Sequence, residues 1–213
     1  MGVEIFYSGS LADRSRIPAF EKDLGDLSRE RGWHHFYAQD ALARSPFPVD
    51  LRGLSLIPYP GSGLVHFHVS PDGRFVDMLE YGRTCVSIAA SESRGSGQAS
   101  KPLASAAEEE LRRLSPTAYA LRHDVVVGEL SVRTLKYGPR AHIAVCEVLD
   151  YVKQRYAPDL EISDDTDYFV HRDPERLAAT MAEASAMMSG VMRAIQGIAE
   201  EQNLEIRVSS VDE

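Results

Sequence analysis

The sequence predicts an α+β fold, with a mainly antiparallel sheet, helices packed on one face of it and a long C-terminal helix. Two observations carry this prediction. In the first half, the segments LVHFHV and RFVDML flank Ser70-Pro71-Asp72-Gly73, which suits a type I turn that closes a β-hairpin. In the second half, helical spacings dominate, and an apolar seam runs from Leu177 to Ile198. Hairpins followed by helices favour this class over a doubly wound parallel sheet.

The composition is that of an ordinary globular protein. With 213 residues, of which 44% are hydrophobic, the chain has enough apolar surface to fold as a single domain over 1–213, with a weak boundary in the small, polar segment 91–101. The net charge of -9 argues against nucleic-acid binding, since phosphate contacts need clustered Lys and Arg.

The location of the chain is predicted from three absences in the sequence. The opening residues MGVEIFYSG do not form a signal peptide, and no apolar run approaches the ~18 residues that a membrane span needs. The two cysteines, Cys85 and Cys146, are typical of reduced thiols rather than of a disulfide framework. We therefore expect a cytoplasmic protein that does not bind membranes.

The first elements are a strand, a helix and a second strand. Alternation over residues 3–7 predicts the first strand. We expect the helix to have Ser15 as its N-cap and Gly32 just past its end. Its apolar face consists of Ile17, Phe20, Leu24 and Leu27. Residues 33–38 then form the next strand.

The middle of the chain is predicted to be rich in strands. Residues 40–52 lack periodicity and are expected to form a loop, and residues 54–57 form a strand before the hairpin already described. One more strand is expected at 84–89, and a helix at 103–114, after the polar segment.

The remaining elements alternate between strands and helices. One or two strands are expected within 124–137, and a helix opens at Gly138-Pro139 and ends near Tyr156. The other predicted elements are a short strand at 160–162, a helix capped by Asp173 that runs to about 202, and a final strand at 204–208.

The last helix carries two regular rows of residues. Its seam has spacings of four and three and consists of Leu177, Met181, Ala184, Met188, Val191, Ile195 and Ile198. Small residues recur at every fourth position, at Ala178, Ala182, Ala186, Gly190 and Ala194, and allow another helix to approach closely. The pattern predicts either a homodimer, or a protein partner docked on the helix, or a helix that lies across its own sheet and bends near Gly190 or Gly197.

Two imidazoles form the first candidate metal site. His66 and His68 are two positions apart on a predicted strand and therefore share a face, opposite to Val65, Phe67 and Val69. Two neutral imidazoles can ligate one metal, although nothing nearby in the sequence supplies a third ligand. The alternative is a solvated pair on an outer sheet face.

Carboxylates form the second candidate metal site, at Asp164 and Asp165. With Asp167 they concentrate on one predicted loop, and hard divalent cations prefer oxygen ligands of this kind. The alternative is a loop of solvated acidic residues.

His142 and Cys146 form a third candidate, one helical turn apart on one helix face. Such a pair can act as base and nucleophile. We prefer core packing for both, because Cys146 lies in the apolar stripe of the helix and a buried thiol is inert.

Two stretches resemble an uncharacterised family of bacterial proteins. They are GSLADRSRIPAFEKDLGDLSRERGW and TLKYGPRAHIAVCEVLDYVKQRYAPDLEISDDTDYFVHRD, of which the second is similar to a block with a Gly-Pro-x-x-His helix start and a later Asp-Glu-Gly-Gly-Tyr-Trp. In this sequence Thr166-Asp167 stands in place of the two glycines. The resemblance implies a cytoplasmic bacterial protein with no established activity, and it directs attention to His142, Asp164, Asp165 and Tyr168.

The sequence contains no G-x-S-x-G, P-loop or H-E-x-x-H motif, so its first functional prediction is a non-enzymatic protein-interaction module. The module would be acidic, homodimeric through its last helix, and immunity-like or accessory in role. The alternative is a metal-dependent hydrolase that uses a divalent metal at a His/Asp site. A third possibility is a small-molecule binder with a pocket between the sheet and the helices.

Overall fold

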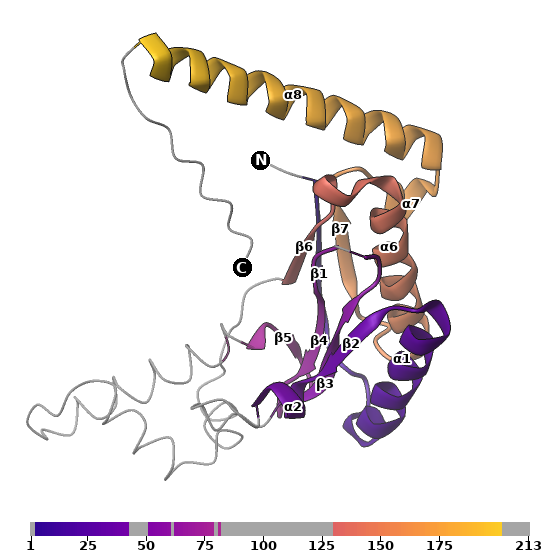
Figure 1. Ribbon diagram of the computed structural model, residues 1–213. Coiled ribbons are helices and arrows are strands. Elements are labelled where there is room, and N and C mark those ends of the chain that lie inside the picture. Colours follow the sequence, from indigo (N-terminus) through magenta and orange to yellow (C-terminus); the bar gives the residue numbers. More distant parts are fainter. Residues whose placement is uncertain (1–2, 43–50, 61, 79–80, 82–129, 202–213) are drawn as a thin grey trace, which may run out of the picture.

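The computed structural model describes residues 3–42, 51–60, 62–78, 81 and 130–201 (Figure 1). Within these ranges it has two antiparallel sheets, helices packed on them and a long C-terminal helix, so the predicted α+β class is confirmed. The strands predicted at 84–89 and 204–208, the helix at 103–114, the polar segment 91–101 and the first part of 124–137 lie outside the described residues.

The first sheet has three strands in the order β6-β1-β7. The central strand β1 (Glu4–Ser8) pairs antiparallel with β6 (Leu130–Arg133) and with β7 (Glu161–Asp164). All three strands were predicted, but β7 runs two residues further than expected. This extension places Asp164 on the strand rather than in the following loop.

The second sheet is a meander of four strands. Its members are β2 (His34–Tyr37), β3 (Arg52–Ile57), β4 (Val65–Val69) and β5 (Phe75–Val76). The predicted hairpin turn between β4 and β5 is confirmed, since the Gly73 amide donates to the Ser70 carbonyl at 2.9 Å. Gly73 has φ 93, a left-handed value that suits glycine.

A short helix stands where the end of a strand and the start of a loop were expected. Residues 38–42 form α2 (Ala38–Leu42), and β3 already begins at Arg52. Five residues are too few to show a helical period, although alanine, glutamine and leucine are all good helix formers.

The two sheets are joined where β1 continues toward β5. The Phe75 amide donates to the Gly9 carbonyl at 2.9 Å, and the Leu11 amide donates to the Gly73 carbonyl at 2.8 Å. Nearby, the Tyr7 hydroxyl accepts from the His66 amide at 2.8 Å and donates to the His66 carbonyl at 3.0 Å. The side chain of Tyr7 in β1 thus forms hydrogen bonds with both the backbone amide and the backbone carbonyl of His66 in β4.

Two helices lie side by side next to the sheets (Figure 1). They are α1 (Ile17–Arg31) and α6 (Gly138–Arg155), which follow the one-turn 3₁₀ helices η1 (Arg14–Arg16) and η2 (Leu135–Tyr137). Gly32 ends α1 with φ 68, as predicted. The predicted Ser15 cap is wrong, because Asp13 caps η1 by accepting from the Ser15 amide at 2.9 Å.

One apolar core connects both sheets with α1 and α6. Phe20 of α1 is fully buried at its centre. Its ring contacts those of Phe67 and Phe75 in the second sheet and that of Tyr156 just after α6, at centroid distances of 6.2, 6.0 and 5.1 Å.

The C-terminal helix α8 (Pro174–Glu201) follows the single turn α7 (Tyr168–His171). Asp173 is its cap, as predicted, and accepts from the amides of Glu175 and Arg176 at 3.0 and 3.1 Å. Its 28 residues give a length of about 42 Å. The first turns pack on the body through Leu177 and Met181, and the rest extends past the sheets (Figure 1).

Among the helices that the structure describes, none combines the length and the apolar content that crossing a bilayer requires.

Candidate functional site

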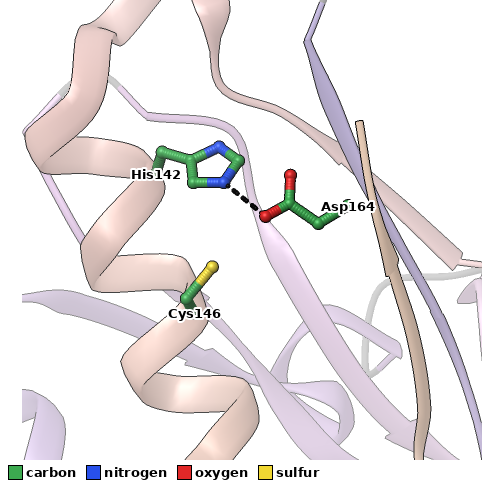
Figure 2. Close-up of side chains that lie close together, drawn as sticks. All are labelled: His142, Cys146 and Asp164. Carbon is green, nitrogen blue, oxygen red and sulfur yellow. Dashed lines mark hydrogen bonds and ion pairs between the residues drawn. The ribbon is translucent and has the colours of Figure 1, made fainter. Parts of the chain in front are cut away.

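His142 and Asp164 form a buried pair between α6 and β7 (Figure 2). The Nε2 atom of His142 lies 3.0 Å from Oδ2 of Asp164, and their side chains are 0% and 2% exposed. The helix start at Gly138-Pro139 brings the imidazole to the sheet, and the last residue of β7 brings the carboxylate to it.

Asp164 accepts further hydrogen bonds from the loop that follows it. The amide and the hydroxyl of Thr166 both donate to Oδ1 at 2.8 Å, and the Phe169 amide donates to Oδ2 at 2.9 Å. Burial acts to raise the pKa of Asp164, but hydrogen bonds with His142 and these loop groups outweigh it and lower the pKa to about 2. The carboxylate is therefore ionised at neutral pH.

The other ring nitrogen of His142 is also held. Its Nδ1 lies 2.8 Å from Oγ1 of Thr134, a buried residue just after β6. The Thr134 hydroxyl donates to the Val3 carbonyl at 3.3 Å. Tyr168 meets the imidazole edge to face, at a centroid distance of 5.9 Å. The imidazole thus connects the first sheet, α6 and α7.

Cys146 lies one helical turn after His142 and is fully buried. One ligand atom from each of His142, Cys146 and Asp164 lies within 4.8 Å of the other two. Burial, and then the charge of Asp164, raise the pKa of the Cys146 thiol well above its usual range. A protonated, buried thiol is not a nucleophile, in agreement with the preference for core packing.

The two predicted carboxylate ligands do not point to one place. Asp165 lies outside the pair described above, where its Oδ2 accepts from the Glu4 amide at 3.0 Å. Among the described residues, the one group of three metal-ligating side chains is that of His142, Cys146 and Asp164. Each of these residues was a candidate from the sequence, but Cys146 was not combined with Asp164.

His66 and His68 share a face of β4, as predicted, and converge on one hydroxyl. Oγ of Ser55 lies 3.0 Å from Nδ1 of His66 and 2.9 Å from Nε2 of His68. The alternative of a solvated pair is wrong, because His68 is only 2% exposed. In the part of the chain that the structure describes, no third His, Cys, Asp or Glu joins them as a ligand.

The burial of the two imidazoles determines their charge. Burial lowers the pKa of both, and that of His68, which is also near His66, falls to about 4. Both are neutral at pH 7. Within the described ranges, Nδ1 of His68 has no hydrogen-bond partner.

The hydroxyl groups of both clusters were missed by the sequence analysis. Ser55 lies opposite His66 in the β3–β4 register, and Thr134 and Thr166 approach His142 from two different segments. Serine and threonine are common throughout protein sequences, so their presence does not indicate a site. Their positions in space also depend on strand register, which the sequence does not specify by itself.

Comparison with protein-family models, with curated proteins and with solved structures finds no match.

Proposed function

We propose that the chain is a non-enzymatic protein-interaction module, acting in the cytoplasm in an accessory or immunity-like role, and that it binds a second copy of itself through α8. One observation supports this most: the apolar seam of α8 continues beyond the body of the protein. Val191, Ile195 and Ile198 are 41%, 43% and 55% exposed. We call Met188, Val191, Ile195 and Ile198 the outer seam.

The outer seam continues the same heptad positions that pack inside the protein. Leu177 and Met181 are buried against Val3 and Leu135, and the outer seam repeats their spacing about two to five turns after Met181. Neighbouring exposed apolar side chains on one helix face mark a contact surface rather than scattered surface residues.

A second copy fits the outer seam in an antiparallel arrangement. Met188 then faces Ile198 of the second copy, and Val191 faces Ile195, so every seam position meets an apolar partner. The body lies at the N-terminal end of α8 (Figure 1), so antiparallel pairing keeps the two bodies apart, whereas parallel pairing would bring them together.

The charge and shape of the helix favour self-association over a charged partner. Arg193 is the only charged residue from 184 to 198, and its Nε donates to the Ser189 carbonyl on its own helix. The acidic residues that give the chain its net charge of -9 therefore lie outside residues 184–198. None of them meets a like charge in the contact. A Cβ added at Gly190 or Gly197 would meet nothing within 4 Å, which leaves room for close approach.

The expected dimer is weak. Burying what remains exposed of four seam side chains in each copy contributes about 1 kcal/mol per side chain, or about 8 kcal/mol in all. Losing translational and rotational freedom costs about 4–15 kcal/mol. We therefore expect a dimer that forms with rising concentration rather than an obligate one.

The experiment is sedimentation equilibrium of the full chain from micromolar to near-millimolar concentration. The wild type should pass from one to two chains per particle. Ile195→Glu places a charge in the outer seam and should remain monomeric throughout. The matched control is Gln196→Glu, which adds the same charge at the next, exposed position outside the seam and should dimerise like the wild type.

Two outcomes would overturn the proposal. A wild type that stays monomeric at every concentration would mean that another protein, or residues 202–213, covers the outer seam. A dimer that Ile195→Glu does not weaken would place the contact elsewhere. Circular dichroism of both variants checks that neither result reflects unfolding.

The alternative of a metal-dependent hydrolase has less support. A catalytic metal keeps a coordination position open to substrate. The side chains of His142 and Cys146 are completely buried, which counts against a reaction at that cluster.

A further inference from the structure

We propose that His142, Cys146 and Asp164 form a closed, structural site for a thiophilic divalent cation, with zinc as the first candidate (Figure 2). This site is separate from the outer seam and does not depend on the proposed dimer. The inference rests on ligand chemistry, on the protons of the hydrogen-bond network and on the charge of the cluster.

The ligand chemistry is that of a borderline-soft metal. Imidazole nitrogen, thiolate sulfur and carboxylate oxygen are the three protein ligands that zinc accepts, at about 2.0–2.3 Å. A tetrahedral centre with such bonds separates its ligand atoms by roughly 3.3–3.8 Å. In the structure the three atoms lie within 4.8 Å of one another, and the nitrogen and oxygen are 3.0 Å apart, so small side-chain rotations suffice.

The hydrogen bonds around His142 leave room for a cation between its Nε2 atom and Asp164. The Thr134 hydroxyl donates to the Val3 carbonyl and is therefore an acceptor for an Nδ1–H group. A neutral ring protonated at Nδ1 directs the lone pair of Nε2 at the carboxylate of Asp164. Two acceptors at 3.0 Å need a positive centre between them, which is either a second ring proton or a metal ion.

Among the residues that the structure describes, the one hydroxyl near Nε2 directs its proton elsewhere. The Thr166 hydroxyl lies 3.2 Å from Nε2 but donates to Oδ1 of Asp164. A metal-binding histidine characteristically donates its other N–H to a nearby acceptor, and a metal-binding carboxylate is held by further hydrogen bonds. Here Thr134 is the acceptor for the other N–H of His142, and the amides of Thr166 and Phe169 donate to the carboxylate of Asp164.

The charges balance when a divalent cation is bound. Asp164 contributes one negative charge, Cys146 contributes a second when it releases its proton on binding, and the neutral imidazole contributes none. The buried cluster is then neutral as a whole, which burial requires. These side chains fill three of the four positions of a tetrahedral centre, and a bound water would fill the fourth. Since Cys146 and His142 are completely buried, that position is closed to a substrate, and the metal would fasten α6 to β7.

The test uses the full chain, purified without a metal-affinity tag or chelator, then unfolded and refolded with zinc or cobalt(II). We expect about one zinc per chain after dialysis, by elemental analysis. We expect cobalt to give the thiolate charge-transfer band and the intense visible bands of a tetrahedral centre. The midpoint of thermal unfolding should rise with zinc.

Variants assign the signal to this cluster. Cys146→Ser should abolish the charge-transfer band, whereas Cys85→Ser, the matched control at the only other cysteine, should keep it. His66→Gln should also leave binding unchanged, which separates this cluster from the His66/His68 pair.

The wild type by itself can overturn the proposal. If refolding with zinc or cobalt yields no bound metal and no rise in thermal stability, a ring proton holds the pair together. The same conclusion follows if Cys146→Ser folds by circular dichroism and retains the cobalt charge-transfer band. If Cys146→Ser does not fold, the metal content of the wild type remains decisive.

Discussion

His68 makes the stability of the protein sensitive to pH. Its pKa is about 4 in the folded chain, mainly because of burial and then of the nearby His66, with Asp77 acting in the opposite direction. In the unfolded chain the pKa returns to about 6.5. As pH falls, the unfolded chain takes up the proton first, so protonation favours unfolding.

The free energy of unfolding should therefore fall between pH 6.5 and 4, by up to about 3 kcal/mol for His68. His66 adds to this loss, because its pKa is shifted in the same direction. Urea denaturation at several pH values, followed by circular dichroism, measures the profile. His68→Gln should make the profile shallower in this window and leave the part due to His66, and a wild-type profile that is already flat there would contradict the prediction.

Asp164 acts in a separate, more acidic window. In the metal-free chain its pKa of about 2 lies below the ordinary value of 3.8. The stability that it contributes is complete above the ordinary pKa and is lost as pH falls toward 2. His68→Gln should leave this second loss unchanged, so the two effects can be distinguished.

At the residue scale, the candidate site was predicted in its members but not in its geometry. His142, Cys146 and Asp164 were each named, but Asp165 was grouped with Asp164. Successive strand residues point to opposite faces, and β7 ends at Asp164, so only this carboxylate turns toward His142. The end of a strand is among the least predictable features of a sequence, and here it decides which acid is buried.

Asp167 illustrates the same limit. It has φ 56, in the left-handed region that favours glycine. Propensity alone does not reveal a left-handed aspartate.

At the element scale, the local signals of helix ends were the most reliable. Gly32, Pro139 and Asp173 each act where their residue type predicts, because caps depend on a few neighbouring backbone groups. Ser15 failed for the same local reason, since Asp13 is the better acceptor and lies two residues earlier.

The cap at Asp173 makes a direct prediction for α8. Asp173→Ala removes the acceptor of the Glu175 and Arg176 amides and should lower the free energy of unfolding by about 1 kcal/mol. Asp173→Ser keeps an acceptor and should recover most of the loss. Urea denaturation compares the three proteins, and equal midpoints for Ala and wild type would contradict this role.

At the scale of the whole molecule, the sequence predicted antiparallel hairpins but not their division into two sheets. The division depends on β1 pairing with β6 and β7, which are more than 100 residues away in the sequence. Pairing over such distances leaves no local pattern. The single domain over 1–213 stays a prediction, which Phe20 makes testable.

Phe20→Ala should destabilise both sheets together. Its ring fills the space between Phe67, Phe75 and Tyr156, and the cavity left by its loss should cost about 3–5 kcal/mol. Hydrogen–deuterium exchange of peptides from β1 and β4 should accelerate by the same factor. Leu27→Ala, at a partly buried position on the same helix, is the milder control. Faster exchange in β4 alone would indicate two separately folding units.

The hydrogen bonds between Tyr7 and His66 have a consequence for aggregation. Among the described strands, β5 pairs with only the last two residues of β4, and no described strand pairs with the backbone of His66 on that side. A strand edge with a free amide and a free carbonyl is a template on which another chain can add a strand, the first step toward aggregates. One phenol hydroxyl occupies both groups and closes that template.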